Sequence, residues 1–209
     1  IYKYQEIDGF IQNENEEVIG CKTKGGKAFY GDLFISNIDI KKTIDMLGER
    51  KFGKPFSRRV KSLEVTPSAF TVYLVFKPNS FPYVNHNIYH FNSIDDVWDT
   101  FEKPTNDWPN TYIATFSGDS ENPTFSESMT VMTYMTYDEV EQWEATYNVE
   151  TNENFGNRGA DYEEFKRLKA DAIISKLEKK FPTIREHITA IQTSSPLSYR
   201  DFIDTKKGN

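Results

Sequence analysis

The chain has 209 residues, of which 37% are apolar and 15% aromatic, and 32 acidic residues against 25 basic ones give a net charge of −7. This acidic balance argues against binding to a nucleic-acid backbone, which needs clustered Lys and Arg. No apolar run approaches the roughly 20 residues that span a bilayer. We therefore expect a soluble chain of one large or two small domains with a core rich in aromatic rings.

The cysteine content and the two ends of the chain suggest a compartment and a context. Cys21 is the single cysteine and has no partner for a disulfide, and there is no Asn-x-Ser/Thr glycosylation acceptor. A reducing cytoplasm is therefore the expected compartment. The sequence starts at Ile1 inside an alternation of apolar and polar residues and ends in the polar run 204–209. Both ends suggest a piece of a longer protein.

The first forty residues predict short strands joined by Gly- and Asn-containing turns, which is typical of a β-meander. The expected strands are residues 2–12, 18–23 and 27–30 and the apolar run 33–36. Asp39 then suits the N-cap of a helix over residues 40–47, and Gly48 suits its C-terminal end.

A basic stretch follows this helix. Residues 50–61 contain Arg50, Lys51, Lys54, Arg58, Arg59 and Lys61. One interpretation is a solvated surface loop. The alternative is a patch that contacts the anionic headgroups of a membrane surface, where each charge contributes roughly 1 kcal/mol.

The middle of the chain predicts a sheet with helices. Residues 69–76 are β-branched and aromatic, as in a central strand buried on both faces. Further strands are expected at 87–91, 112–116 and 130–136. A helix capped by Ser93 is predicted to face the sheet with Ile94, Val97, Trp98 and Phe101.

Two capping-box patterns predict further helices. One begins at Asp138, and the other begins at Asp161 and ends before Pro182. A polar loop at residues 151–159 is expected between them. The elements together predict an α+β fold, in which a mixed β-sheet covered by helices follows a short β-meander.

His86, His90 and Cys21 are of types that often carry chemistry, but their sequence context favours structural roles. His86 and His90 fall in a predicted strand, where a spacing of four residues spans about 13 Å, so no metal site is expected. Cys21 is interpreted as a small packed residue rather than a nucleophile. The chain contains neither GxGxxG nor GxxxxGK[ST], so it lacks the usual loop for a dinucleotide or a triphosphate.

A methionine-rich segment suggests a pocket for a long hydrophobic molecule. Three of the four methionines, Met129, Met132 and Met135, fall within seven residues. Unbranched, polarisable side chains adapt to irregular apolar ligands. Ordinary core strands are the alternative interpretation. The predicted substrate-binding residues are Phe70, Tyr73, Val75, Met132 and Tyr134.

Residues 18–26 and 31–39 resemble a segment of the FAD-dependent phytoene desaturases, carotenoid isomerases and retinol saturases. That family has "V-x-G-V-x-x-x-D-G" leading into "A-D-x-V-V-S-N-A-D-P"; Ser36, Asn37 and Asp39 match, while Ile38 and Ile40 replace Ala and Pro. The likeness continues at 68–70, at 86–88 and before Phe181. Residues 193–202 are similar to the family's "T-P-L-T-Y-R-D-Y" segment.

The resemblance implies a flavoenzyme whose architecture is like that of the amine oxidases. Residues 1–40 would be a meander of the FAD-binding domain, 41–192 the substrate-binding domain and 193–209 a return segment. FAD would bind the longer protein rather than this piece, with Ser36, Asn37 and Pro196 as flavin-adjacent candidates.

The implied reaction is desaturation, saturation or isomerisation of a hydrophobic conjugated polyene, carotenoid- or retinoid-like. The implied partner is this hydrophobic small molecule, with no nucleic acid. Neither a catalytic acid or base nor an oligomeric state is predicted. The rival interpretation is a non-catalytic domain that binds an apolar ligand or a protein.

Overall fold

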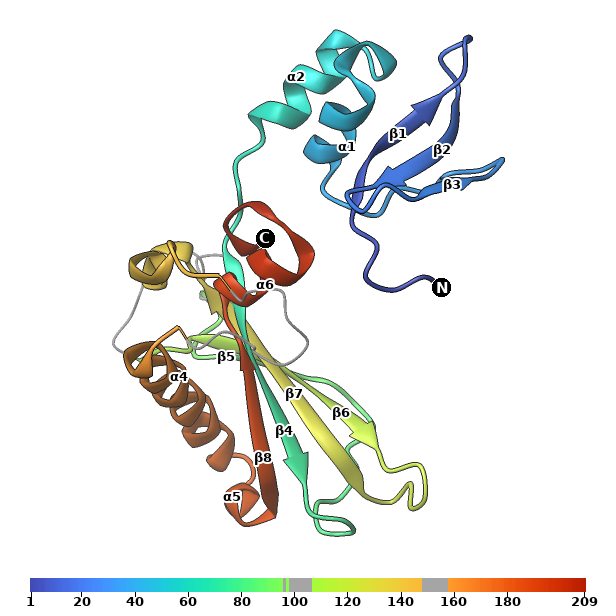
Figure 1. The fold of residues 1–209 in the computed structure, drawn as a ribbon. Helices are drawn as coiled ribbons and strands as arrows, with labels where there is room; N and C mark the ends of the chain where they lie inside the picture. Colours follow the sequence, from blue (N-terminus) through green and yellow to red (C-terminus); the bar gives the residue numbers. More distant parts are fainter. Residues whose placement is uncertain (96, 98–106, 148–157) are drawn as a thin grey trace. The chain divides into compact units, whose positions relative to one another are not determined.

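The computed structural model describes residues 1–95, 97, 107–147 and 158–209, and they form two compact units. Unit 1 comprises Ile1–Glu64 and unit 2 comprises Val65–Asn209. The predicted α+β class is confirmed, because each unit combines antiparallel strands with helices (Figure 1). The division into an FAD-domain meander, a substrate domain and a return segment stays a prediction.

Unit 1 is a three-stranded antiparallel meander followed by two helices. The strands β1 (Ile7–Gln12), β2 (Val18–Thr23) and β3 (Ala28–Tyr30) pair in that order. The first turn is held by Asn13, whose Oδ1 accepts hydrogen bonds from the backbone N–H groups of Asn15 and Glu17. Residues 33–36 form no strand, contrary to prediction.

The missing strand has a physical explanation. A strand needs a neighbour for its N–H and C=O groups, and within the described residues none pairs with residues 33–36. The side chains of Leu33 and Ile35 are consequently 81% and 86% exposed. An apolar run alone therefore did not specify a strand.

The helices of unit 1 are α1 (Ile40–Leu47) and α2 (Lys54–Ser62), separated by the 3-10 turn η1 (Glu49–Lys51). The predicted N-cap of α1 is confirmed, since Asp39 Oδ1 accepts a 2.8 Å hydrogen bond from the Lys41 N–H. The Gly48 N–H donates to the Ile44 carbonyl with a φ of 88°, in the region that favours glycine. The basic stretch is not a loop, because most of it is η1 and α2.

Unit 2 is built on a five-stranded sheet in the order β5-β6-β7-β4-β8. All four pairings are antiparallel, where a mixed sheet was expected. The strand β4 has a partner on each side, as predicted for a central strand, but it is buried on one face only: Val72 and Leu74 are fully buried, whereas Tyr73 and Val75 on the other face are 38% and 43% exposed. The strands are β4 (Ser68–Phe76), β5 (Ile88–Phe91), β6 (Thr111–Gly118), β7 (Ser126–Met135) and β8 (Ile188–Ser194).

Helix α4 (Ala160–Glu178) lies along one face of this sheet and closes the core (Figure 1). Short helical segments complete the unit: η2 (Tyr137–Glu139), η3 (Glu141–Trp143), α5 (Ile184–His187), α6 (Pro196–Ile203) and η4 (Lys206–Gly208). The core joins alternate residues of β4 and β7 to one side of α4, including Phe70, Val72, Leu74, Met129, Val131, Ile173 and Leu177.

The structure corrects parts of three helix predictions, and other parts lie outside the described residues. The helix expected from Asp138 is a pair of 3-10 turns. The helix from Asp161 is confirmed as α4, but Asp161 does not cap it and instead accepts a 2.9 Å hydrogen bond from Trp143 Nε1. Of the helix after Ser93, Trp98 and Phe101 lie outside the described residues, and Ile94 is 82% exposed rather than packed on the sheet. Most of the predicted loop 151–159 also lies outside them.

The described residues hold neither a metal-binding cluster nor a membrane-spanning helix. They contain no group of three or more His, Cys, Asp or Glu side chains placed to hold a metal ion. Among the helices of the described part of the chain, none is both long and apolar enough to cross a bilayer.

Candidate functional site

The pleat of β4 and β7 sorts the predicted substrate-binding residues onto two faces, because successive side chains of a strand point to opposite sides. Phe70 belongs to the set that packs under α4 and is fully buried. Tyr73, Val75, Met132 and Tyr134 point to the other face and are between 38% and 44% exposed. The structure therefore places these four on one face of the sheet and Phe70 on the other.

The strand register extends this second face across the sheet. Met132 lies between Thr71 of β4 and Ile113 of β6, and Ile113 in turn pairs with Tyr89 of β5. Directly opposed residues in antiparallel strands have Cβ atoms about 4.5–5.5 Å apart, so their side chains are in contact range. We call this surface the open sheet face: Tyr73, Val75, Tyr89, Ile113, Met132 and Tyr134.

The open sheet face is a surface, and two hollows of the described residues lie elsewhere. One, of about 480 Å³, belongs to unit 1 and includes Glu16 and Lys51 in its lining. The other, of about 330 Å³, lies beside α4 and β8 and includes Glu163 and Arg185. Charged linings of this kind do not suit an apolar ligand. Neither hollow is lined by the residues predicted to bind one.

Helix α6 supplies a polar border to the open sheet face. The Tyr199 hydroxyl lies 2.5 Å from Thr71 Oγ1, and α6 covers Thr71 enough to leave it buried. Burial raises the pKa of Tyr199 above its usual value, and the neighbouring Tyr73 hydroxyl raises it further, although the hydrogen bond from Thr71 opposes the shift. Tyr199 is thus a neutral phenol at physiological pH, suited to hydrogen bonding rather than to acting as an ionised base.

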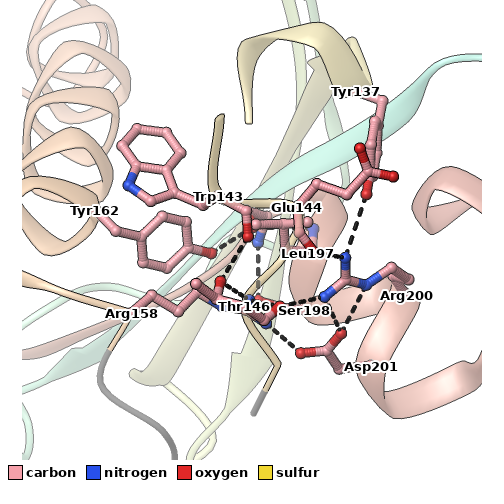
Figure 2. A network of polar contacts seen from close by, with 11 residues as sticks. Tyr137, Trp143, Glu144, Thr146, Arg158, Tyr162, Leu197, Ser198, Arg200 and Asp201 are labelled. Atoms are coloured by element: carbon pink, nitrogen blue, oxygen red, sulfur yellow. Dashed lines mark hydrogen bonds and ion pairs between the residues drawn. The ribbon is translucent and has the colours of Figure 1, made fainter. Parts of the chain in front are cut away.

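A buried polar network fixes α6 in place (Figure 2). The carboxylate of Asp201 pairs with Arg158 through one oxygen and, at 2.8 Å, with Arg200 through the other. The side chains of Arg158 and Asp201 are only 2% and 4% exposed. Arg200 also donates to the backbone carbonyls of Glu144 and Thr146, at 2.8 and 2.6 Å.

The N-terminus of α6 is tied to α4 by Ser195. Its fully buried hydroxyl accepts a 3.2 Å hydrogen bond from the Leu197 N–H and lies 2.6 Å from the Tyr162 hydroxyl. The backbone N–H of Ser195 in turn donates to Ser198 Oγ, which completes a capping box. Ser195 therefore connects the helix that carries Tyr199 to the core of unit 2.

Ser195→Ala should lower the free energy of unfolding by about 2 kcal/mol, because it removes an N-cap and leaves the buried Tyr162 hydroxyl without this partner. Urea denaturation followed by circular dichroism measures the change. Ser198→Ala is the matched control, since that side chain is less buried and its loss should cost less. Equal effects of the two substitutions would contradict the central role given to Ser195.

Sequence reasoning missed this network. Residues 193–202 were singled out only as a family-like segment, and neither β8 nor α6 was predicted. A usable signal was present, because Ser195 followed by Pro196 is a typical N-cap and first-turn pair. The partnership of Arg158 with Asp201 spans 43 positions and has no comparable local signal.

The flavin-adjacent candidates lie in both units, and each is described here in its own unit. In unit 1, Ser36 Oγ lies 2.7 Å from Thr43 Oγ1, and Asn37 is exposed. In unit 2, Pro196 is buried, and Gly208 packs so closely against it that a Cβ there would lie 2.1 Å from the Pro196 carbonyl oxygen. Their assignment to a flavin stays a prediction.

Comparisons with known proteins give a similar curated sequence and a solved structure that aligns with most of the chain. No family model matches the chain. It is 26% identical over 199 residues to the chloroplastic prolycopene isomerase of Daucus carota; the match covers 93% of this chain but only 29% of the carrot protein. The crystal structure of the PF1083 protein from Pyrococcus furiosus is similar at 14% identity and a TM-score of 0.41. The alignment covers 91% of this chain and 36% of the PF1083 chain. The first match agrees with the resemblance seen in the motifs.

Proposed function

We propose that this chain is part of an FAD-dependent oxidoreductase or isomerase that acts on a hydrophobic conjugated polyene of the carotenoid or retinoid type. The observation that carries the proposal is the similarity to a prolycopene isomerase along 93% of the chain. The motif order in the sequence supports the same assignment. The chain spans about 29% of the length of that relative, so the activity belongs to the whole protein.

In this proposal the open sheet face is one wall of the substrate site. A polyene offers no charge and few hydrogen-bonding groups, so its affinity comes from apolar area removed from water, about 25 cal/mol per Å². Tyr73, Met132 and Tyr134 supply aromatic and thioether surface suited to a long, flat chain. The opposing wall would come from another part of the protein.

The hydroxyl groups at the border of the face would orient one end of the substrate. Tyr199 is held by Thr71 and lies beside Tyr73, so phenol hydroxyl groups stand where the apolar surface stops. They can donate or accept a hydrogen bond at a polar end group. FAD, when bound, would supply the redox chemistry, and it would be held mainly by segments outside these 209 residues.

A non-catalytic domain that binds an apolar ligand or a protein is the second candidate. The half-exposed apolar side chains of the open sheet face favour it too, because exposed apolar surface often marks an interaction site. This alternative needs no flavin and predicts binding without chemical change.

An experiment on the full-length protein separates the two candidates. We expect the purified protein to show flavin absorbance near one FAD per chain, and to convert a carotenoid or retinoid to an isomer or to a product of altered conjugation, followed by chromatography. Binding of the polyene without flavin and without conversion would support the non-catalytic domain and overturn the proposed enzyme.

A further inference from the structure

A basic surface with exposed apolar side chains lies on η1 and α2 of unit 1. Residues 48–63 contain six basic residues and the single acid Glu49, although the chain as a whole carries a net charge of −7. All six basic side chains are exposed. We call it the basic helical surface: Arg50, Lys51, Lys54, Phe56, Arg58, Arg59, Lys61 and Leu63.

The fold of α2 directs charge outward. Ser57 and Val60 are its buried residues and face the rest of unit 1. Lys54 and Arg58 are one turn apart and both are exposed, so their charges lie side by side at the surface of the helix.

Part of this charge is not neutralised within the protein. Lys51 pairs with Glu16, and Lys61 pairs with Asp45 and Glu49. For Arg50, Lys54 and Arg58, the described part of the chain provides no acid within ion-pair distance. Arg59, which packs on the Phe56 ring, likewise has no such acid among the described residues, so these four are the cations available to an external anion.

Apolar side chains are interspersed with the cations. Phe56 is 39% and Leu63 57% exposed. The Phe56 ring stacks on Phe52 at 6.1 Å between centroids, and the Arg59 guanidinium lies 6.0 Å from the Phe56 centroid. Cations surrounding exposed apolar groups are typical of helices that lie on a membrane surface.

We propose that the basic helical surface binds the anionic headgroups of a lipid membrane, with Phe56 and Leu63 contacting the interface. A membrane is favoured over a nucleic acid because the chain is acidic overall and an aliphatic group such as Leu63 gives no base stacking. The proposal stands on unit 1 alone and does not depend on the polyene or the flavin.

The test is co-sedimentation of the 209-residue chain with vesicles. We expect binding to phosphatidylcholine vesicles that contain phosphatidylserine, weak binding to phosphatidylcholine alone, and weaker binding as salt increases. Because one Lys or Arg strengthens binding to an anionic surface about fivefold, the variant Arg50→Gln/Lys54→Gln/Arg58→Gln should bind about a hundredfold less tightly.

The matched control changes the same amount of charge elsewhere in unit 1. Lys3, Lys22 and Lys27 are exposed and lie outside residues 48–63, so the triple variant with Gln at those positions should keep most of the vesicle binding. Thermal melting verifies that both variants fold. Equal losses in the two variants, no binding by the unsubstituted chain, or equal affinity for single-stranded RNA would each overturn the proposal.

Discussion

Met132→Asp is expected to abolish polyene turnover by the full-length protein while the protein stays folded with its flavin bound. Met132 is 43% exposed on the open sheet face, so an aspartate there keeps its hydration and should change the free energy of unfolding by less than about 1 kcal/mol. A substrate lying on that face would have to dehydrate the carboxylate without a partner. Such dehydration costs several kcal/mol, which corresponds to at least a hundredfold loss of turnover.

Met129→Asp is the matched control in the same strand. Met129 is fully buried on the opposite face, within the core under α4. An unpaired carboxylate at that position costs an amount comparable to the total stability of a domain, about 5–15 kcal/mol, so this variant should unfold. Met132→Leu preserves apolar area and should retain both fold and turnover.

Three measurements compare the variants. Chromatography of the polyene reports turnover, absorbance reports flavin per chain, and thermal melting followed by circular dichroism reports folding. If Met132→Asp unfolded like Met129→Asp, the open sheet face would be core in the whole protein. If Met132→Asp turned over the polyene normally, the substrate would bind elsewhere. Either result removes the open sheet face from the proposed function.

Local signals were enough to predict several elements. The run from Phe70 to Phe76 predicted a buried strand, because β-branched and aromatic residues suit a pleated surface packed on its neighbours. Asp39 predicted the start of α1, because a short acidic side chain satisfies a free N–H group of the first turn. In both cases the decisive interactions lie within a few residues or follow from composition alone.

Other features depended on partners that a local pattern does not reveal. The basic charge at 50–61 suggested a loop, but burial of Ser57 and Val60 stabilises a helix there. Asp161 matched a capping box, yet its carboxylate accepts a hydrogen bond from the indole N–H of Trp143. This hydrogen bond lowers the pKa of Asp161. In both cases the outcome depended on contacts that lie outside the local sequence pattern.

The candidate site was predicted in composition but not in geometry. The sequence placed Phe70 with Tyr73, although an offset of three residues in a strand puts them on opposite faces. Tyr199 was not predicted, because α6 reaches Thr71 only once β8 has paired with β4. The site is therefore a product of sheet register, which depends on pairings between segments far apart in the sequence.

Removal of either partner from the Arg158–Asp201 pair is expected to destabilise unit 2 strongly, with the larger effect at Asp201. Both side chains are almost fully buried, and breaking a buried ion pair typically costs about 3–5 kcal/mol. Arg158→Met leaves Asp201 paired with Arg200, so its cost should be near the lower value. Asp201→Leu leaves two guanidinium groups that share the Thr146 carbonyl, so its cost should be near the upper value.

Urea denaturation of each variant measures these costs, and Arg167→Met is the matched control. Arg167 pairs with Glu164 on the exposed side of α4, where water screens the interaction, so its loss should leave the denaturation midpoint unchanged within error. The double variant Arg158→Met/Asp201→Leu should cost less than the sum of the single changes, because one arginine then remains without a buried neighbour of like charge. Additive costs, or a larger effect from Arg158→Met, would show that Asp201 does not join the two arginines into one network.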